Sequence, residues 1–332
     1  MTNNSSPSNR NRRQPAPGST DDPAEWHHET AYLNNIAVHY VTVTPNLDAV
    51  DHPTGAAPLV VLLHGFPEHW YTWHHQLSSL ANAGYRVVAP DLRGYNRSSA
   101  PAGVESYRTA ELVADVRGLV HHHGSSRATL IGHDIGGLIA WETAIREPEL
   151  VDQLAILNAP HPDLYRRHLG RSPTQLFRSL YVFAAQLPWV PERILEADGY
   201  RVVAETLTHL PGTEAFTETD IRRFRAAMEQ SESPAGPLNY YRAVGRDTVE
   251  TGLRMLLGRE EQTQRAVDVP TLVFWGEHDP ALEVTLLDGL HRLVPDLQVS
   301  RLPETGHWPH IEHPQRVTDE IRSFLANAQT GG

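Results

Sequence analysis

The residues best suited to chemistry in this sequence form one short stretch, Gly132-His133-Asp134-Ile135-Gly136. An apolar, β-favouring run precedes the stretch and an apolar run typical of a helix start follows it. Glycines two positions before and two positions after one reactive side chain are what a tight strand-to-helix turn requires, because larger neighbours would collide. Such a turn lifts one side chain off the sheet, beside a helix N-terminus that favours an anion. Serine is the usual occupant, so an aspartate at 134 changes the expected chemistry.

A carboxylate at this position suits attack on a saturated carbon, which displaces a leaving group and forms an ester on the enzyme. An acid and a histidine follow Asp134 in the order expected of a catalytic triad, Asp279 and then His307. We expect His307 to activate the water that hydrolyses the ester, and Asp279 to orient the imidazole and stabilise its cation. The backbone N–H groups of Phe66 and Ile135 are expected to stabilise the oxyanion.

Three neighbouring residues compete for roles in this site. Glu277 is the alternative to Asp279 as the acid, because it lies two positions earlier in the same predicted loop. His278, between them, is expected to point away. We expect His133 to support the structure or the pocket rather than to take part in catalysis.

The elements that must position these groups alternate between strands and helices. The expected strands are Ile36–Val43, Pro58–Leu63, Tyr85–Ala89, the run ending at Gly132, Gln153–Leu157, Thr271–Trp275 and Leu297–Leu302. Expected helices include a segment with Trp70, Trp73 and Leu77, then Tyr107–His123, the segment ending at Arg146, Val284–Leu293 and Pro314–Ala326. This alternation predicts an α/β fold with a doubly wound, mostly parallel sheet, whose functional residues lie in loops beyond the carboxyl ends of the strands.

The regular pattern divides the chain into three parts. Residues 1–25 are polar and rich in Pro, Gly and Arg, which predicts a disordered tail. Residues 26–160 and 249–332 are expected to form the α/β core. Between them, residues 161–248 contain short helical patterns with frequent aromatic residues, which indicate an inserted helical cap.

Composition excludes several classes of function. The chain has 332 residues and a formal net charge of -12 at pH 7, which argues against nucleic acid and anionic membrane surfaces as main partners. It contains no cysteine, so thiolate catalysis and thiolate metal sites are excluded and a reducing cytoplasm is the expected location. No apolar run is long enough for a transmembrane helix, and no apolar segment follows the N-terminal arginines as a secretory signal requires.

The run His121-His122-His123 raises the question of a metal site. It ends a predicted helix just before Gly124, where histidine side chains can interact with the last carbonyls. Adjacent helical residues point in different directions, so three of them do not form one ligand set. We therefore expect no metal and no cofactor.

Several motifs resemble those of an epoxide hydrolase of the α/β-hydrolase superfamily, the soluble type with an aspartate nucleophile. The resemblance covers about residues 30 to 328. It rests on the elbow and on His64-Gly65-Phe66-Pro67-Glu68 with Trp70 and Trp73, Asp91-Leu92-Arg93-Gly94-Tyr95, and Asn158-Ala159-Pro160-His161-Pro162. Asn96 stands where that family has glycine, and asparagine tolerates a left-handed backbone. The resemblance implies an α/β-hydrolase fold and a substrate pocket that includes Trp70, His133, Asn158 and Trp308.

Two stretches of the predicted cap resemble the segments that carry the family's epoxide-polarising tyrosines. Gly236-Pro237-Leu238-Asn239-Tyr240-Tyr241-Arg242 places one on Tyr241, with Tyr240 as the alternative if the register differs by one. Leu180-Tyr181-Val182-Phe183 places the other on Tyr181. An epoxide oxygen leaves as an alkoxide, so a hydrogen-bond or proton donor opposite the carboxylate is needed. Packing of these tyrosines within a helical lid is the other interpretation.

The resemblance implies the conversion of an epoxide and water into a vicinal diol, with the epoxide and water as the partners and a homodimer as a possible assembly. Haloalkane dehalogenases share the aspartate nucleophile and are the alternative enzyme class, but their pattern has Trp after the nucleophile, or Arg in fluoroacetate dehalogenases, where this chain has Ile135. A ligand-binding α/β-hydrolase-fold protein without turnover is the alternative outside enzymes, and is disfavoured because every triad and oxyanion part is present. A serine-type esterase is disfavoured by Asp134.

Overall fold

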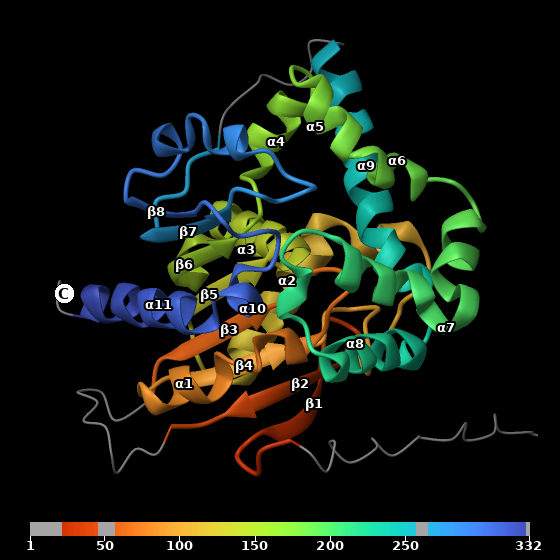
Figure 1. Cartoon of the computed structure of the whole chain (residues 1–332). Coiled ribbons are helices and arrows are strands. Elements are labelled where there is room, and N and C mark those ends of the chain that lie inside the picture. The colour runs from red at the N-terminus through yellow and green to blue at the C-terminus, as the bar shows by residue number, and fades with distance from the viewer. Residues whose placement is uncertain (1–21, 46–56, 257–264, 330–332) are drawn as a thin grey trace, which may run out of the picture.

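A computed structural model describes residues 22–45, 57–256 and 265–329 of the chain (Figure 1). Its centre is an eight-stranded sheet with the order β1-β2-β4-β3-β5-β6-β7-β8. The strands are β1 (His27–Leu33), β2 (Ile36–Val43), β3 (Leu59–Leu63), β4 (Arg86–Pro90), β5 (Ala128–His133), β6 (Val151–Leu157), β7 (Thr271–Gly276) and β8 (Leu297–Leu302). β1 pairs antiparallel with β2, and β2 pairs antiparallel with β4. The strands from β4 onward in the sheet, in the order β4, β3, β5, β6, β7 and β8, are parallel. The predicted α/β fold with a mostly parallel sheet is confirmed.

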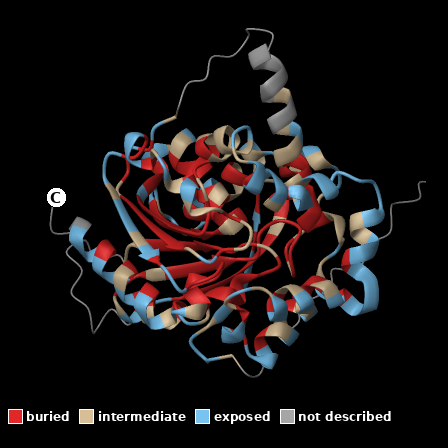
Figure 2. Cartoon of the chain, turned by 45° about the horizontal axis from the view of Figure 1, so that its top comes forward, coloured by how far each residue is buried: buried red, intermediate tan, exposed pale blue. Residues whose placement is uncertain are grey.

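The central strands form because they are continuous apolar runs, and helices cover both of their faces. Every residue of β3, β5 and β7 is buried, as expected for strands of a parallel sheet. α1 (Leu77–Asn82) and α11 (Pro314–Gln329) pack together on one face, and α2 (Thr109–His122) and α3 (Asp134–Arg146) pack on the other. Figure 2 shows the strands buried between helices whose outer faces are exposed.

Three elements differ from the expectation. The helix expected to contain Trp70, Trp73 and Leu77 is instead a 3₁₀ turn, Trp70–Trp73, followed by the separate helix α1. β1 was not expected, because its sequence is polar and five of its seven positions remain partly or fully exposed; the pairing with β2 forms it. The predicted helix Val284–Leu293 is wrong. Two short 3₁₀ turns, Val284–Leu287 and Leu290–Arg292, occupy that range. Gly289 separates them with a φ of 86°, which a continuous helix does not accommodate.

Six α-helices lie in the described part of the chain between β6 and β7. They are α4 (Pro162–Leu169), α5 (Pro173–Arg178), α6 (Leu180–Ala184), α7 (Val190–His209), α8 (Glu218–Gln230) and α9 (Ala235–Leu256). α9 continues past residue 248, the boundary expected from the sequence. We propose that α4 to α9 together form the cap.

The predicted tail falls mainly on residues 1–21, which lie outside the described part of the chain. Its last four residues, 22–25, are described, and Asp22 pairs with Arg223 of α8 at 2.7 Å. None of the described helices has the length and apolar character required to span a membrane.

Candidate active site

The tight turn between β5 and α3 holds Asp134 in a left-handed backbone conformation, with a φ of 49°. A Cβ atom at Gly136 would lie 2.2 Å from the Leu63 carbonyl oxygen of β3, and one at Gly132 would lie 2.5 Å from the Gly136 carbonyl oxygen. Neither approach leaves room for a side chain. The two glycines are thus required because the start of α3 is pressed against β3 and β5. Asp134 accepts the strained conformation, which aspartate tolerates better than most residues.

The loop after β3 supplies a hydrogen-bond donor to Asp134. The backbone N–H of Phe66 donates to Asp134 Oδ2 at 3.0 Å. Glu68 fixes this loop, since its Oε2 accepts from the Gly65 N–H at 2.8 Å. Ile135 is the second residue of α3, where backbone N–H groups have no partner within the helix. Of the two N–H groups expected from the sequence, that of Phe66 thus contacts the Asp134 carboxylate, and that of Ile135 stays a prediction.

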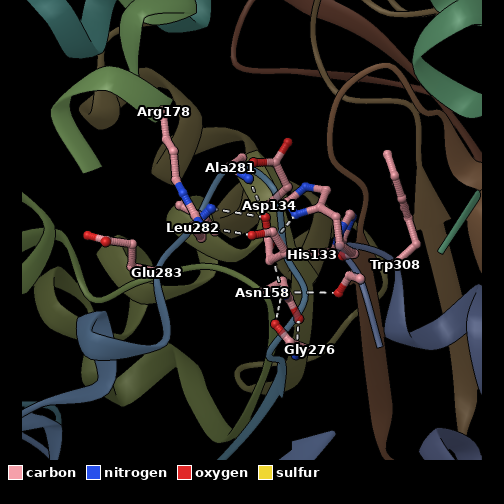
Figure 3. A network of polar contacts seen from close by, with 12 residues as sticks. His133, Asp134, Asn158, Arg178, Gly276, Ala281, Leu282, Glu283 and Trp308 are labelled. Atoms are coloured by element: carbon pink, nitrogen blue, oxygen red, sulfur yellow. Dashed lines mark hydrogen bonds and ion pairs between the residues drawn. The ribbon is translucent and has the colours of Figure 1, made fainter. Parts of the chain in front are cut away.

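The loops after β7 and β8 bring Asp279 and His307 together, and their Oδ2 and Nδ1 atoms are 2.6 Å apart. Asn158, at the end of β6, donates to the same Oδ2 at 2.6 Å. Asp279 Oδ1 accepts from the N–H groups of Ala281 at 2.7 Å and Leu282 at 3.0 Å (Figure 3). Glu277, the alternative acid, instead pairs with Arg301 at 2.6 Å. Asp279 is therefore the carboxylate that orients His307.

Electrostatics favour the charged form of this pair. Burial opposes the charge on His307, but the Asp279 carboxylate, its hydrogen bond and the Asp134 carboxylate outweigh burial and raise the pKa of His307 to about 9. Burial likewise opposes the charge on Asp279, yet His307 and Asn158 hold the pKa of Asp279 below its usual value. With the substrate absent, His307 is thus an imidazolium between two carboxylates at neutral pH.

A cavity of about 470 Å³ lies above Asp134, between the sheet edge and α4 to α9. Core residues Asp134, Ile135 and Leu138 form one side of it. Tyr165, Tyr181, Val182, Tyr240, Tyr241 and Val244 contribute from the inserted helices. A pocket of this size fits a small organic molecule, and its lining includes the Asp134 carboxylate and several phenols.

Tyr181 and Tyr241 face each other in this cavity, with ring centroids 5.4 Å apart and ring planes at 86°. Tyr241 also packs against Phe66 at 5.8 Å. Burial and the Asp134 carboxylate hold the pKa of both phenols well above the ordinary value, so both stay protonated and able to donate. Tyr181 as a whole residue remains 44% exposed, although its phenol group is buried beside Tyr241.

The neighbouring residues Tyr240 and Tyr241 have different surroundings in the structure. Tyr240 is buried, and its hydroxyl donates to the Arg93 carbonyl oxygen at 2.9 Å. That hydrogen bond ties α9 to the loop after β4. The hydroxyl of Tyr240 is therefore already used in a hydrogen bond, whereas the ring of Tyr241 packs against Tyr181.

Comparison with known proteins agrees with this geometry. Residues 58–314 match the family model described as alpha/beta hydrolase fold. Epoxide hydrolase 3 of Xenopus tropicalis is 37% identical over 274 residues, which cover 81% of this chain and 71% of that protein. The chain belongs to the epoxide hydrolase family of the α/β-hydrolase superfamily.

Solved structures support the same family assignment. A Bacillus megaterium epoxide hydrolase in complex with an inhibitor matches with a TM-score of 0.78 and 30% identity, over 90% of this chain and 100% of that one. A mutant of the Bacillus megaterium enzyme, complexed with a naphthyloxy-propane-1,2-diol product, matches with a TM-score of 0.77, 30% identity and the same coverage.

Four residues expected in the pocket of this epoxide hydrolase family member do not line the cavity. Asn158 holds Asp279 and also accepts from the Gly276 N–H at 2.9 Å. His133 contacts the His307 carbonyl from behind. Trp70 packs against Trp26 and His28, and Trp308 packs against Phe216. These four buried side chains support the catalytic loops instead of forming the pocket wall.

The sequence did not reveal the role of Glu68, which belongs to a fully buried cluster with His133 and His310. His133 Nδ1 lies 3.0 Å from Glu68 Oε1, and its Nε2 lies 2.8 Å from the His307 carbonyl oxygen. Both partners are acceptors, so both ring nitrogens of His133 face acceptors in the loops around the site. Burial would raise the pKa of Glu68, but His133 lowers it below the usual value.

These three residues present ligand atoms within 4.8 Å of one another. A metal ion requires a free lone pair on each histidine nitrogen that binds it. Because both nitrogens of His133 already face protein acceptors, the cluster fits a buried hydrogen-bond network better than a metal site. Burial is also complete, so an ion would need the core to open.

Substitution of Gly136 by alanine tests the turn. Because the added Cβ would lie 2.2 Å from a β3 carbonyl oxygen, we expect the free energy of unfolding to fall by roughly 3 kcal/mol or more. Urea denaturation measures it. Gly170→Ala is the matched control, since its Cβ would meet only the Arg167 carbonyl oxygen at 3.7 Å. Equal stability of the two variants would contradict the close approach.

The charge of Asp134 is expected to hold His307 in its cationic form. In Asp134→Asn the pKa of His307 should fall below about 9, with roughly a tenfold rise in the proton dissociation constant. NMR titration of the imidazole resonances measures this shift. Asp152→Asn, at an exposed aspartate of β6, should leave the titration unchanged. An unchanged titration in Asp134→Asn would show that Asp134 does not act on His307.

Proposed function

We propose that this protein hydrolyses an epoxide to a vicinal diol through a covalent ester on Asp134. The observation that carries the proposal is the pair of protonated phenols, Tyr181 and Tyr241, in the cavity that also exposes the Asp134 carboxylate. The named epoxide hydrolases among its relatives, one of them solved with an inhibitor and in mutant form with a diol product, support it.

In the first step, an Asp134 oxygen attacks an epoxide carbon and the ring C–O bond breaks. The departing oxygen takes a proton from Tyr181 or Tyr241 and becomes the first hydroxyl of the diol. A phenol pair is suited to this step, since an alkoxide is a poor leaving group unless a donor holds it. The product of the step is an alkyl ester of Asp134.

In the second step, His307 takes a proton from water and the resulting hydroxide attacks the ester carbonyl of Asp134. The N–H groups of Phe66 and Ile135 stabilise the oxyanion that forms there. Collapse releases the diol, whose second oxygen came from Asp134 and takes its proton from His307. The other proton of the water restores the tyrosine, and an oxygen of the water remains in the carboxylate.

The charge on His307 explains why the two steps occur in order. The Asp134 carboxylate contributes to the raised pKa of His307, about 9 in the free protein. Formation of the neutral ester removes that negative charge, so the pKa of His307 falls, the ring releases its proton to solvent and can act as a base. The ring takes up a proton from solvent again once the Asp134 carboxylate is restored. Formation of the ester does not need neutral His307, whereas hydrolysis of the ester does. The first step should therefore tolerate acidic pH better than the second.

The environment of Asp134 argues against the dehalogenase alternative. Ile135, the residue after the nucleophile, lines the cavity but has no side-chain donor for a halide. The proposed substrate is a small-molecule epoxide with water as the second reactant. The chain has no cysteine, which supports the reducing cytoplasm as the proposed location.

Single turnover in ¹⁸O-water tests the proposed function. We expect ¹⁸O in the proteolytic peptide that contains Asp134, together with diol formed from an aryl or alkyl epoxide. The label enters the carboxylate only if an ester of that residue is hydrolysed at its carbonyl carbon. Halide release from a brominated alkane without diol formation would assign the chain to the dehalogenases.

Removal of the base should separate the two steps. His307→Gln is expected to accumulate the alkyl ester, because attack by Asp134 does not need the base whereas ester hydrolysis does. Intact-protein mass spectrometry should show the added mass of the epoxide. Asp134→Ala gives the control without a nucleophile, and no adduct should form in it. Lack of an adduct in His307→Gln, with an epoxide that the wild type converts, would count against the two-step route.

Removal of the phenols should slow ring opening. Either Tyr181→Phe or Tyr241→Phe alone should lower kcat/KM by about 10²-fold, the range typical of general acids, because the other phenol still donates. The double variant should be far less active. Tyr240→Phe is the matched control, as its hydroxyl bonds Arg93 outside the reaction. A double variant as fast as the wild type would reject the acid pair.

A further inference from the structure

The outer surface of α5, α6 and the start of α7 gathers most of the exposed apolar side chains of the protein. Nine of the eleven large hydrophobic residues that the described chain exposes lie between residues 176 and 194. They are Leu176, Phe177, Leu180, Tyr181, Phe183, Leu187, Trp189, Val190 and Ile194, here called the outer cap surface. Phe177 and Trp189 are 73% and 74% exposed. A contiguous apolar surface of this kind indicates a protein or membrane contact.

This part of the chain is positively charged, whereas the whole chain is negatively charged. Residues 164–191 contain four arginines and no Asp or Glu, although the chain carries a net charge of -12. Arg167 and Arg171 form no ion pair with any residue that the structure describes. The next acidic residue along the chain, Glu192, pairs with Arg242 at 2.7 Å. The outer cap surface is therefore bordered by positive charge.

The outer cap surface is also continuous with the cavity. Tyr181 belongs to both, because it is exposed and lines the cavity. Val182, the next residue of α6, lines the cavity as well. Figure 1 shows α4, α5 and α6 following one another along the outer edge of the inserted helices. One short helix is thus all that separates the apolar exterior from the site above Asp134.

Two kinds of occupant could cover this surface, a second copy of the chain or a lipid bilayer. A two-fold dimer would place the surface against itself, which would bring two sets of unpaired arginines together without acidic partners. An anionic bilayer offers apolar depth for the aromatic rings and negative charge for the arginines, the combination that holds interfacial helices on membranes. The charge of the whole chain predicted no membrane partner, but this local distribution differs from the average.

We propose that the outer cap surface docks on an anionic phospholipid bilayer. Docking would place the exposed side of α6, the helix that carries Tyr181, against the lipid. Lipophilic substrate would then pass from the bilayer into the cavity along α6; this last part rests on the proposed function, whereas docking itself does not.

Vesicle co-sedimentation of the full chain tests docking without any need for catalysis. The protein should sediment with phosphatidylcholine vesicles that contain phosphatidylglycerol, less so at high salt, and should stay in solution with phosphatidylcholine alone. Arg167→Glu with Arg171→Glu should lower the partition coefficient by on the order of 25-fold, about fivefold for each arginine lost. Phe177→Ser with Trp189→Ser should abolish sedimentation.

Matched controls lie on other faces of the molecule. Tyr32→Ser, at an exposed aromatic residue of β1, and Arg322→Glu, on α11, should sediment as the wild type does. All of these variants should form diol from a water-soluble epoxide at the wild-type rate, so loss of docking is distinguishable from loss of function. Absence of sedimentation, equal binding to neutral vesicles, or binding that survives both double variants would overturn the proposal. A vesicle-free dimer that dissociates in Phe177→Ser with Trp189→Ser would assign the surface to a second copy.

Discussion

The site depends on the close contact between the start of α3 and strand β3. Two glycines allow the backbones to touch, and the contact forces Asp134 into the left-handed region. The same contact places the N–H of Phe66 against the Asp134 carboxylate. A side chain at either glycine would separate nucleophile from oxyanion donor. The unfavourable backbone conformation of Asp134 is thus maintained by packing of the whole sheet.

The order of the parallel strands assembles the remaining groups. β3, β5, β6, β7 and β8 are successive neighbours, and each ends in one part of the site. In that order the strands supply Phe66, Asp134, Asn158, Asp279 and His307. Because parallel strands end at the same edge, residues far apart in sequence meet without long loops. The inserted helices then add the phenols from the opposite side.

The sequence was sufficient to predict the parts of the structure that depend on the local residue pattern. Apolar runs predicted the buried strands, and the spacing of glycines around Asp134 predicted the turn; Asn96 has the expected positive φ, 47°. Strand β1 was missed because its pairing with β2, rather than its composition, creates it. The pocket wall was not predictable either. Which side chains line it depends on how α4 to α9 pack, and Trp70, Trp308, His133 and Asn158 lie behind the catalytic loops instead.

The buried contact between Glu68 and His133 has a consequence for how this site can change. Glu68 holds the Gly65 N–H beside the oxyanion donor, and His133 holds the His307 carbonyl. The loop that stabilises the nucleophile and the loop that carries the base are therefore joined through this pair of side chains. Substitutions in the two loops should be epistatic, with effects on rate that do not add. Changes in these two loops are accordingly expected to occur in pairs, whereas cap residues other than the two cavity tyrosines are free of this coupling.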